Sequence, residues 1–227
     1  MNHSSHLHGR TVSSTDQRMT SGRMPYQQTE KTRAHAQGRR DSILRAATAL
    51  ISSGGFAAAS VRAIADESGN AAGSVYRYFG NREKLLASVF RSIADREFRA
   101  VEAATTSAPP TVADRLSSLL ATFSTRALRN PTMAEALLFE PVNPLVESER
   151  LTFRRRYHDL VVTVIRDGIL ASEIPDQDAE LSARSIIGAN AEALMGRLSP
   201  ESSVTDPDYL IASVTTFCLR ALGAPQP

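Results

Sequence analysis

Cysteine is nearly missing from this chain of 227 residues, in which Cys218 is the only one. One cysteine excludes an internal disulfide and a cysteine-rich zinc site. Long apolar runs are missing too, since no segment approaches the roughly 18 consecutive apolar residues of a membrane-spanning helix. The first residues are polar and have no apolar core of the kind found in secretory signals. We therefore expect a cytoplasmic protein with no membrane partner.

Histidines and glycine-rich loops are scarce where an enzyme would need them. Four of the five histidines lie within residues 1–38, at His3, His6, His8 and His35. A metal-binding tail is one interpretation of these four, but histidines scattered through a polar tail are usually incidental. No glycine-rich phosphate loop is present, and no pattern positions a serine-based triad, although the sequence does not exclude one. We predict a protein that is not an enzyme, with no catalytic residues, no cofactor and no metal.

The alternation of apolar and polar residues that marks a β-strand is found nowhere in the chain. Apolar residues recur instead at helical spacing, and in the first predicted helix they are Ile43, Leu44, Ala47, Leu50 and Ile51. The sequence therefore predicts an all-α protein. Its expected helices, about nine in number, cover roughly residues 39–52, 60–67, 71–78, 81–104, 111–130, 132–139, 146–171, 178–198 and 207–222.

Charge is divided unevenly along the chain. Residues 1–104 hold 15 Lys+Arg and 9 Asp+Glu, a net charge of +6, whereas residues 105–227 hold 11 and 15, a net charge of −4. A basic half joined to an acidic half is expected when only one part of a protein meets a polyanion. Ala108-Pro109-Pro110 lies close to the change of sign and marks a domain boundary or a hinge.

Three segments are expected along the chain. Residues 1–38 contain few large apolar residues and are predicted to form a disordered basic N-terminal arm, which either lies along DNA or is a leader with no such role. Residues 39–85 are predicted to form a three-helix helix-turn-helix DNA-binding domain. Residues 86–227 are predicted to form a second helical domain, in which residues 86–104 are the connecting helix.

Caps and turns delimit the helices of residues 39–85. Gly54-Gly55 is expected to end the first helix, and Ser60 is a good N-cap for the second. Gly69-Asn70 is expected to make the following turn, because both residues tolerate positive φ. We expect Asn70 to cap the short third helix and Asn81 to cap the fourth. This layout is that of a helix-turn-helix, whose recognition helix enters the major groove of DNA.

Polar and basic side chains suited to DNA cluster around the predicted third helix. Those that offer a hydroxyl or a positive charge to phosphate oxygens are Ser60, Arg62, Ser74, Tyr76, Tyr78 and Lys84. Gly73 allows close approach of the backbone to DNA, because it has no Cβ atom. Arg77 is expected to contact either a phosphate or a guanine edge. Val75 and Phe79 are expected to lie in the core.

This segment resembles the N-terminal domain of the tetracycline-repressor (TetR) family of bacterial transcription regulators. Order, spacing and residue type agree in Ser60-Val61-Arg62-Ala63-Ile64-Ala65, Gly69, Gly73-Ser74-Val75-Tyr76-Arg77-Tyr78-Phe79 and Asn81-Arg82-Glu83-Lys84-Leu85. The resemblance implies that the DNA backbone is contacted by Ser60, Tyr76, Tyr78 and Lys84. It implies that the surface facing the bases is formed by Ala72, Gly73, Ser74 and Arg77. Asn70-Ala71 departs from the family pattern, and the operator sequence is therefore not implied.

The resemblance also implies that residues 86–227 form a helical ligand-binding and dimerisation domain. The last two predicted helices are expected to pair with a second copy of the chain through Ile186, Ile187, Leu194, Leu198, Leu210, Val214 and Phe217. A small-molecule pocket is expected to be lined by Phe123, Met133, Leu137, Phe153, Tyr157 and Asn190. Asn190 interrupts an apolar stripe, so its amide needs a partner, which is a ligand, the backbone or the second subunit.

The sequence thus predicts a ligand-responsive transcriptional regulator, most simply a repressor. It is expected to bind a palindromic operator in double-stranded DNA as a homodimer and to be released by a small-molecule effector that the sequence does not identify. The fourth predicted helix is the expected lever between the two halves, since it is joined to both. Two alternatives stay open: a helical adaptor protein that does not bind DNA, and an α-helical enzyme of uncharacterised activity.

Overall fold

The computed structural model describes residues 30–195, 197–198 and 206–224. Within these ranges it contains only α-helices, joined by turns and short loops, as the sequence predicts. They are α1 (Glu30–Ala58), α2 (Val61–Ser68), α3 (Ala72–Phe79), α4 (Arg82–Ser107), α5 (Val112–Arg129), α6 (Pro131–Leu138), α7 (Pro144–Leu170), α8 (Ala179–Leu194) and α9 (Pro207–Leu222). Over the same described residues, every helix is too short or too polar to cross a membrane.

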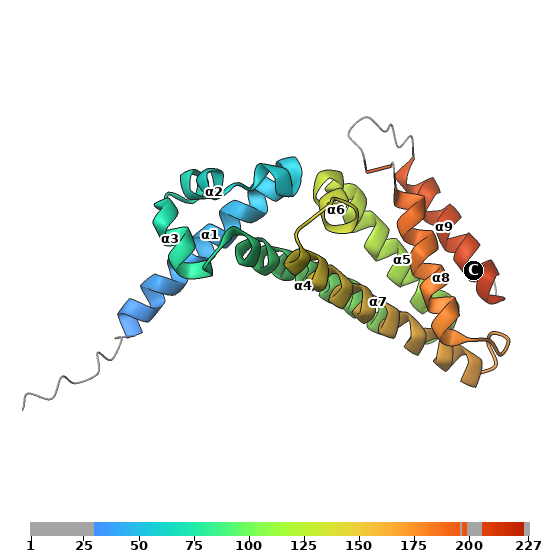
Figure 1. Ribbon diagram of the computed structural model, residues 1–227. Coiled ribbons are helices and arrows are strands. Elements are labelled where there is room, and N and C mark those ends of the chain that lie inside the picture. The colour runs from blue at the N-terminus through green and yellow to red at the C-terminus, as the bar shows by residue number, and fades with distance from the viewer. Residues whose placement is uncertain (1–29, 196, 199–205, 225–227) are drawn as a thin grey trace, which may run out of the picture.

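The helices form a small head and a larger bundle (Figure 1). The head consists of α1, α2 and α3, and α4 runs from it along the length of the bundle beside α7. Helices α5, α8 and α9 pack at the other side of the bundle, and α6 lies against α1. Cys218 lies inside α9, where burial raises the pKa of its thiol to about 11 and makes it unreactive.

Helix α1 begins nine residues earlier than the sequence predicted. The expectation of a disordered arm over residues 1–38 is therefore wrong for residues 30–38, which are helical; residues 1–29 lie outside the described part of the chain. Low apolar content excludes burial of this segment but not helix formation. Adding turns to an existing helix avoids the unfavourable nucleation step, and the packed turns around Ile43 supply that nucleus.

A glycine pair interrupts α1 near its C-terminal end, as predicted. Gly54 and Gly55 leave the helical region, with φ of −153° and +69° respectively, and the chain then buries Phe56. Gly55 is required twice over. Its φ is positive, and a Cβ atom at this position would lie 2.6 Å from the Oε2 atom of Glu140.

Most of the predicted caps are confirmed. The Ser60 side chain accepts a hydrogen bond from the Ala63 backbone N–H, and the Asn81 side chain accepts one from that of Lys84. Gly69 takes the left-handed conformation that ends α2. The predicted cap at Asn70 is wrong, because the Asn70 amide instead donates to the Ser42 hydroxyl at 3.1 Å and to a carbonyl within the turn. It thereby ties the turn before α3 to α1.

Head and bundle share one apolar core. The cluster that contains Ile43, Ile64 and Phe79 of the head continues through the first half of α4 to α6 and α7. A row of three rings runs through it: the centroids of Phe56 and Phe90 lie 6.4 Å apart, and those of Phe90 and Phe153 lie 6.2 Å apart. The head is therefore packed rigidly against the bundle rather than tethered to it.

Candidate DNA-binding face and ligand cavity

The residues predicted to contact DNA all lie at the surface of the head. Ser60, Arg62, Ala72, Gly73, Tyr76, Arg77 and Lys84 are exposed, and Ser74 and Tyr78 are half-buried. Two residues of α3, Val75 and Phe79, are buried, and they hold the helix against the head so that its other side faces outward. Tyr76 is 50 % exposed, so its side chain is accessible on the outer side of α3.

Arg77 and Tyr78 form one unit at the end of α3. The Arg77 guanidinium lies over the Tyr78 ring, 5.0 Å from its centroid, and its Nη2 atom donates to the Tyr78 hydroxyl at 3.3 Å. Stacking of this kind restricts the arginine before any DNA is bound. The sequence predicts Arg77 and Tyr78 as two separate DNA contacts, whereas the structure shows that the two side chains contact each other.

Lys84 and Arg62 lie at the beginnings of neighbouring helices. The Lys84 side chain runs back past Gly80, where an added Cβ atom would lie 3.7 Å from its Cδ atom. Lys84 thus places its ammonium near the exposed end of α3. Arg62 and Asp66 form an ion pair at 3.9 Å, but both side chains are almost fully exposed, so this contact leaves Arg62 available to a phosphate.

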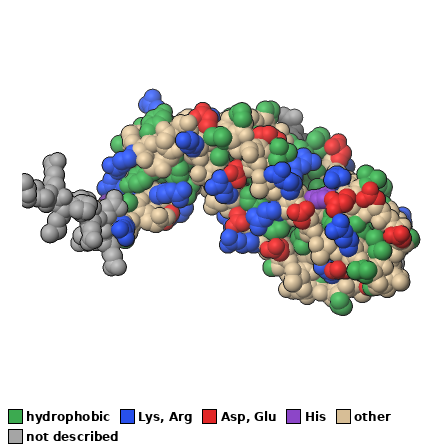
Figure 2. All heavy atoms as spheres, turned by 60° about the horizontal axis from the view of Figure 1, so that its bottom comes forward, with side chains coloured by type: hydrophobic (Ala, Val, Ile, Leu, Met, Phe, Trp, Pro, Cys, Tyr) green, Lys and Arg blue, Asp and Glu red, His purple; other side chains and the backbone are tan. Residues whose placement is uncertain are grey.

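The head has the charge needed for a polyanion. Residues 32–90 hold eight Lys+Arg and four Asp+Glu, a net charge of +4. Figure 2 shows Lys and Arg side chains distributed over the lobe that contains the head, with few acidic side chains among them, whereas both signs alternate over the bundle. This surface favours a nucleic-acid partner at the head.

A mainly apolar cavity of about 200 Å³ lies inside the bundle, between α4, α5, α6, α7 and α8. The structure brings all six predicted pocket residues to its wall, namely Phe123, Met133, Leu137, Phe153, Tyr157 and Asn190. Arg154, one of three consecutive arginines that the sequence offers to an anionic ligand, also lines it, together with polar residues that the sequence did not indicate, among them Arg96, Glu97, Arg126, Asn130 and Arg150. An apolar cavity with few polar groups is the usual form of a small-molecule site.

An ion-pair cluster forms one part of the cavity wall. Glu97 accepts from Arg126 at 2.5 Å and from Arg96 at 3.0 Å. The hydrogen bond with Glu97 raises the pKa of the Arg126 guanidinium, so this residue stays charged. Two arginines facing one carboxylate leave an excess of positive charge at this wall.

Tyr157 places a neutral hydroxyl at the cavity. Its ring makes edge contacts with Phe98 and Phe123, at centroid distances of 5.0 Å and 5.4 Å. Burial raises the pKa of Tyr157 well above its usual value, so the hydroxyl keeps its proton at physiological pH. Among the described residues, no hydrogen-bond partner for this hydroxyl is found, which leaves it as a donor for a ligand.

The partner of Asn190 is a residue that the sequence did not indicate. The buried Ser124 hydroxyl of α5 donates to the Asn190 Oδ1 atom at 3.1 Å. The amide therefore links α8 to α5 at the cavity wall. Its oxygen has a side-chain partner within the subunit, and the partner of the amide nitrogen stays a prediction.

Four of the predicted dimer residues are buried within the subunit. Ile186, Leu194, Leu198 and Val214 lie in its cores, so they offer no surface to a second copy and the prediction is wrong for them. Ile187 and Leu210 are half-buried, and Phe217 is 60 % exposed. The other large apolar side chains exposed on α8 and α9 are Leu181 and Tyr209, at 59 % and 73 %.

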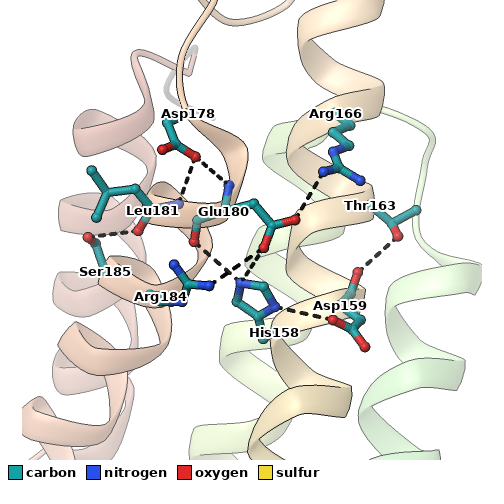
Figure 3. A network of polar contacts seen from close by, with 9 residues as sticks. All are labelled: His158, Asp159, Thr163, Arg166, Asp178, Glu180, Leu181, Arg184 and Ser185. Atoms are coloured by element: carbon teal, nitrogen blue, oxygen red, sulfur yellow. Dashed lines mark hydrogen bonds and ion pairs between the residues drawn. The ribbon is translucent and has the colours of Figure 1, made fainter.

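The joint between α7 and α8 is polar (Figure 3). His158 of α7 lies between two carboxylates: its Nδ1 atom is 3.2 Å from Asp159 and its Nε2 atom is 3.2 Å from Glu180 of α8. Arg166 and Arg184 also reach Glu180, at 3.0 Å and 3.8 Å. These contacts fix α8 on α7 and thereby hold the cavity wall that α8 contributes.

The contact between head and bundle depends on a residue that sequence reasoning missed. The Glu140 side chain, in the loop after α6, accepts hydrogen bonds from the backbone N–H groups of Phe56 and Ala57, at 2.8 Å and 3.1 Å. We call this contact the Glu140 clamp. Arg150 of α7 supports it by donating to the Glu140 and Leu137 carbonyl oxygens, both at 2.8 Å.

The clamp connects directly to the cavity. Helix α6 supplies Met133, Ala134, Leu137 and Leu138 to the cavity wall, and Glu140 follows two residues after its end. On the head side, Arg82 donates to the Phe56 carbonyl oxygen at 3.1 Å, next to the N–H that Glu140 binds. These hydrogen bonds connect the end of α6 with the kink of α1 and the start of α4. This is the architecture of a helix-turn-helix protein whose DNA-binding head is joined to a ligand chamber.

Comparison with known proteins identifies the family. Residues 43–89 match the family model described as "Bacterial regulatory proteins, tetR family". The HTH-type transcriptional repressor KstR of Mycobacterium tuberculosis is 29% identical over 175 residues, which cover 74% of each chain. The repressor KstR2 of Rhodococcus jostii is 29% identical over 200 residues, or 83% of this chain and 93% of that protein. The head therefore carries the DNA-binding domain of the tetR family, and the similarity to TetR-type repressors extends over most of the chain at 29% identity.

A solved structure with the same fold is that of the transcriptional regulator FadR from Bacillus subtilis in complex with stearoyl-CoA. It superposes with a TM-score of 0.69 at 22% sequence identity, and the match covers 78% of this chain and 96% of that one. FadR from Bacillus halodurans gives a TM-score of 0.67, also at 22% identity. At this level of identity the likeness concerns the fold.

Proposed function

We propose that this protein is a transcriptional repressor that binds a palindromic operator as a homodimer and leaves it when a small molecule enters the cavity. The observation that carries the proposal is the direct connection between the cavity wall and the head through α6 and the Glu140 clamp. In this proposal residues 39–85 form the DNA-binding unit and residues 86–227 form the ligand-binding and dimerisation unit. The head residues that the sequence predicts to contact DNA phosphates or bases keep those roles in this proposal.

The proposed dimer uses the outer sides of α8 and α9. Leu181, Tyr209 and Phe217 are large, apolar and exposed in the single subunit, and half-buried Ile187 and Leu210 belong to the same two helices. Exposed apolar side chains gathered on neighbouring helices are typical of a subunit interface. Two-fold pairing there places two α3 helices on successive half-sites of a palindrome.

The proposed ligand has an apolar body and an anionic end. The cavity lining is mostly aliphatic and aromatic, whereas Arg96, Arg126 and Arg154 supply positive charge at its wall. The Tyr157 hydroxyl adds a neutral donor, of the kind that fits a carbonyl or thioester oxygen. An acyl-CoA has these properties, and the FadR structure with the same fold contains stearoyl-CoA.

The proposed switch works through α6. A ligand that widens the cavity displaces α6, and with it the Glu140 clamp and the Phe56, Phe90 and Phe153 ring row. The head then takes an angle at which two α3 helices no longer match successive major grooves. Weakening operator binding 100-fold requires about 2.7 kcal/mol of coupling, which lies within the usual range.

A mobility-shift titration tests this function. Full-length protein is mixed with DNA from upstream of its own coding region at fixed salt, and stearoyl-CoA, stearate and CoA are added separately. We expect a shift that unrelated competitor DNA does not abolish and that stearoyl-CoA reverses. CoA alone is expected to have little effect. If no upstream DNA gives a sequence-specific shift, the repressor function is contradicted. If the shift is seen but no acyl compound reverses it, the proposed ligand class is contradicted.

Filling the cavity is expected to separate ligand binding from DNA binding. Ala134→Phe places a ring into the cavity from α6, where Ala134 lines the wall. We expect stearoyl-CoA affinity in calorimetry to fall at least about 10-fold, at an overpacking cost of about 1–3 kcal/mol, with operator affinity retained. Ala103→Phe, at an exposed position of α4 outside the cavity, is the matched control. Equal affinity of Ala134→Phe and wild type contradicts this site.

A further inference from the structure

The first turns of α1 protrude from the head with no core beneath them. Residues 32–39 are exposed or half-buried, and the first buried residue of the helix is Ile43. Figure 1 shows this part of α1 continuing past α3 at the free end of the head. We call residues 32–42 the α1 extension. The packed turns around Ile43 supply the nucleus for this part of the helix, and any role of its own side chains lies at the surface.

The α1 extension is basic, and its arginine side chains form no ion pairs with the acidic side chains that the structure describes. It contains Arg33, Arg39 and Arg40 against a single acid, Asp41. Asp41 accepts from Gln37 at 2.8 Å, and Arg39 donates to His35 at 3.2 Å. Within the described part of the chain, none of these three arginines forms an ion pair with an acidic side chain. They are therefore free to neutralise an external anion.

In the structure, the extension and the recognition helix are joined into one continuous surface. Arg40 lies over the ring of Phe79 of α3, 5.1 Å from its centroid, and the Asn70 amide bonds Ser42 to the turn before α3. A shallow groove separates the two elements, with His35 and Arg39 of the extension on one side and Ala71 and Ser74 on the other. A duplex seated on α3 therefore meets the extension as well.

We propose that the α1 extension is a second DNA-contacting element, whose arginines bind the phosphate backbone beside the half-site that α3 occupies. The proposal rests on the function proposed above. Its occupant is the duplex because the surface is cationic and polar and is continuous with the DNA-binding face. Phosphate contacts of this kind raise affinity for all sequences and set the register of the recognition helix.

Gly38 makes the contribution of the extension adjustable. Glycine in an exposed helix costs about 1 kcal/mol relative to alanine, and a helix of this length is marginal without packing. A Cβ atom at Gly38 would meet nothing within 4 Å, so alanine fits there. The extension is expected to be frayed in free protein and fully helical on DNA, which makes its helical propensity a determinant of operator affinity.

The test compares full-length variants by fluorescence anisotropy on the operator over a series of salt concentrations. For Arg33→Ala/Arg39→Ala we expect binding about 10-fold weaker and a log–log salt slope smaller by about 3.6, since each of four phosphate contacts in a dimer contributes about 0.9. Arg129→Ala/Arg155→Ala, which removes two exposed arginines of the bundle, is the charge-matched control. Gly38→Pro is expected to weaken binding and Gly38→Ala to strengthen it about 3-fold.

Two results overturn the proposal. One is equal affinity and salt slope of the Arg33→Ala/Arg39→Ala variant and its control; the other is a loss confined to the operator while binding to unrelated DNA is unchanged. Thermal unfolding is expected to be the same for wild type and the Arg33→Ala/Arg39→Ala variant, because both arginines are exposed and contact no core residue. If wild-type protein binds no DNA specifically, the proposed function fails; if it binds and the variants match the control, only the role of the extension fails.

Discussion

Replacing Tyr78 and Lys84 together with alanine is expected to weaken DNA binding on the order of 100-fold. A dimer loses four phosphate contacts, each worth about 0.7 kcal/mol, within the range for a net hydrogen bond to a charged or polar group. The loss of the Tyr78 ring also frees Arg77, whose guanidinium is stacked on it. The measurement is anisotropy on operator and on random DNA at several salt concentrations.

Both DNAs are expected to lose affinity equally, because phosphate contacts carry no sequence information. The salt slope is expected to fall by about 1.8 for the two lysines of a dimer. Tyr78→Phe keeps the ring and the stack and removes only the hydroxyl, and Arg155→Ala controls for the loss of one positive charge far from the head. A change of less than about 3-fold in the double variant, or a loss on the operator alone, contradicts the assigned roles.

Breaking the Glu140 clamp is expected to lower stability and to disconnect the ligand from the operator. Glu140→Ala leaves the Phe56 and Ala57 backbone N–H groups without their carboxylate acceptor. The Phe56 N–H is part-buried and the Ala57 N–H is exposed to water, so their loss of the acceptor costs about 2 kcal/mol in total, which corresponds to a fall in melting temperature of roughly 4–8 °C for a domain of this size. We expect the effect of stearoyl-CoA on operator affinity to drop from about 100-fold to below about 10-fold.

Glu135→Ala is the matched control for the clamp. Glu135 lies on α6, is exposed, and loses the same charge on substitution. Stearoyl-CoA affinity itself should be retained in Glu140→Ala, because Glu140 does not line the cavity. If Glu140→Ala keeps the full ligand response, the clamp is a structural contact and the signal takes another route, such as the α4 lever that the sequence indicated.

Local features of this protein were predictable and distant contacts were not. The caps at Ser60 and Asn81 each join residues three positions apart, so both partners lie close together in the sequence. The clamp joins Glu140 to Phe56, 84 positions away, and a single glutamate in a loop carries no sign of it. Only Gly55 reflects the contact, since it alone admits the carboxylate.

The ligand cavity and the proposed dimer surface differ in how well the sequence predicted their residues. The six pocket residues were found because a bundle this size has few places where aromatic and aliphatic stripes converge. The dimer residues were mostly misplaced because α8 and α9 each carry apolar residues on two sides, and periodicity does not say which side faces inward. Ile186 and Val214 took the inner side, and Leu181 and Phe217 the outer.

The ring row of Phe56, Phe90 and Phe153 bears on how such regulators are recombined. A head grafted onto a foreign ligand chamber loses the third ring and the acceptor for its α1 kink unless both come with it. Functional chimeras of this protein are therefore those whose crossover point keeps Gly55 matched with Glu140, and a junction placed by the helix-turn-helix boundary alone would yield a hybrid that no effector controls.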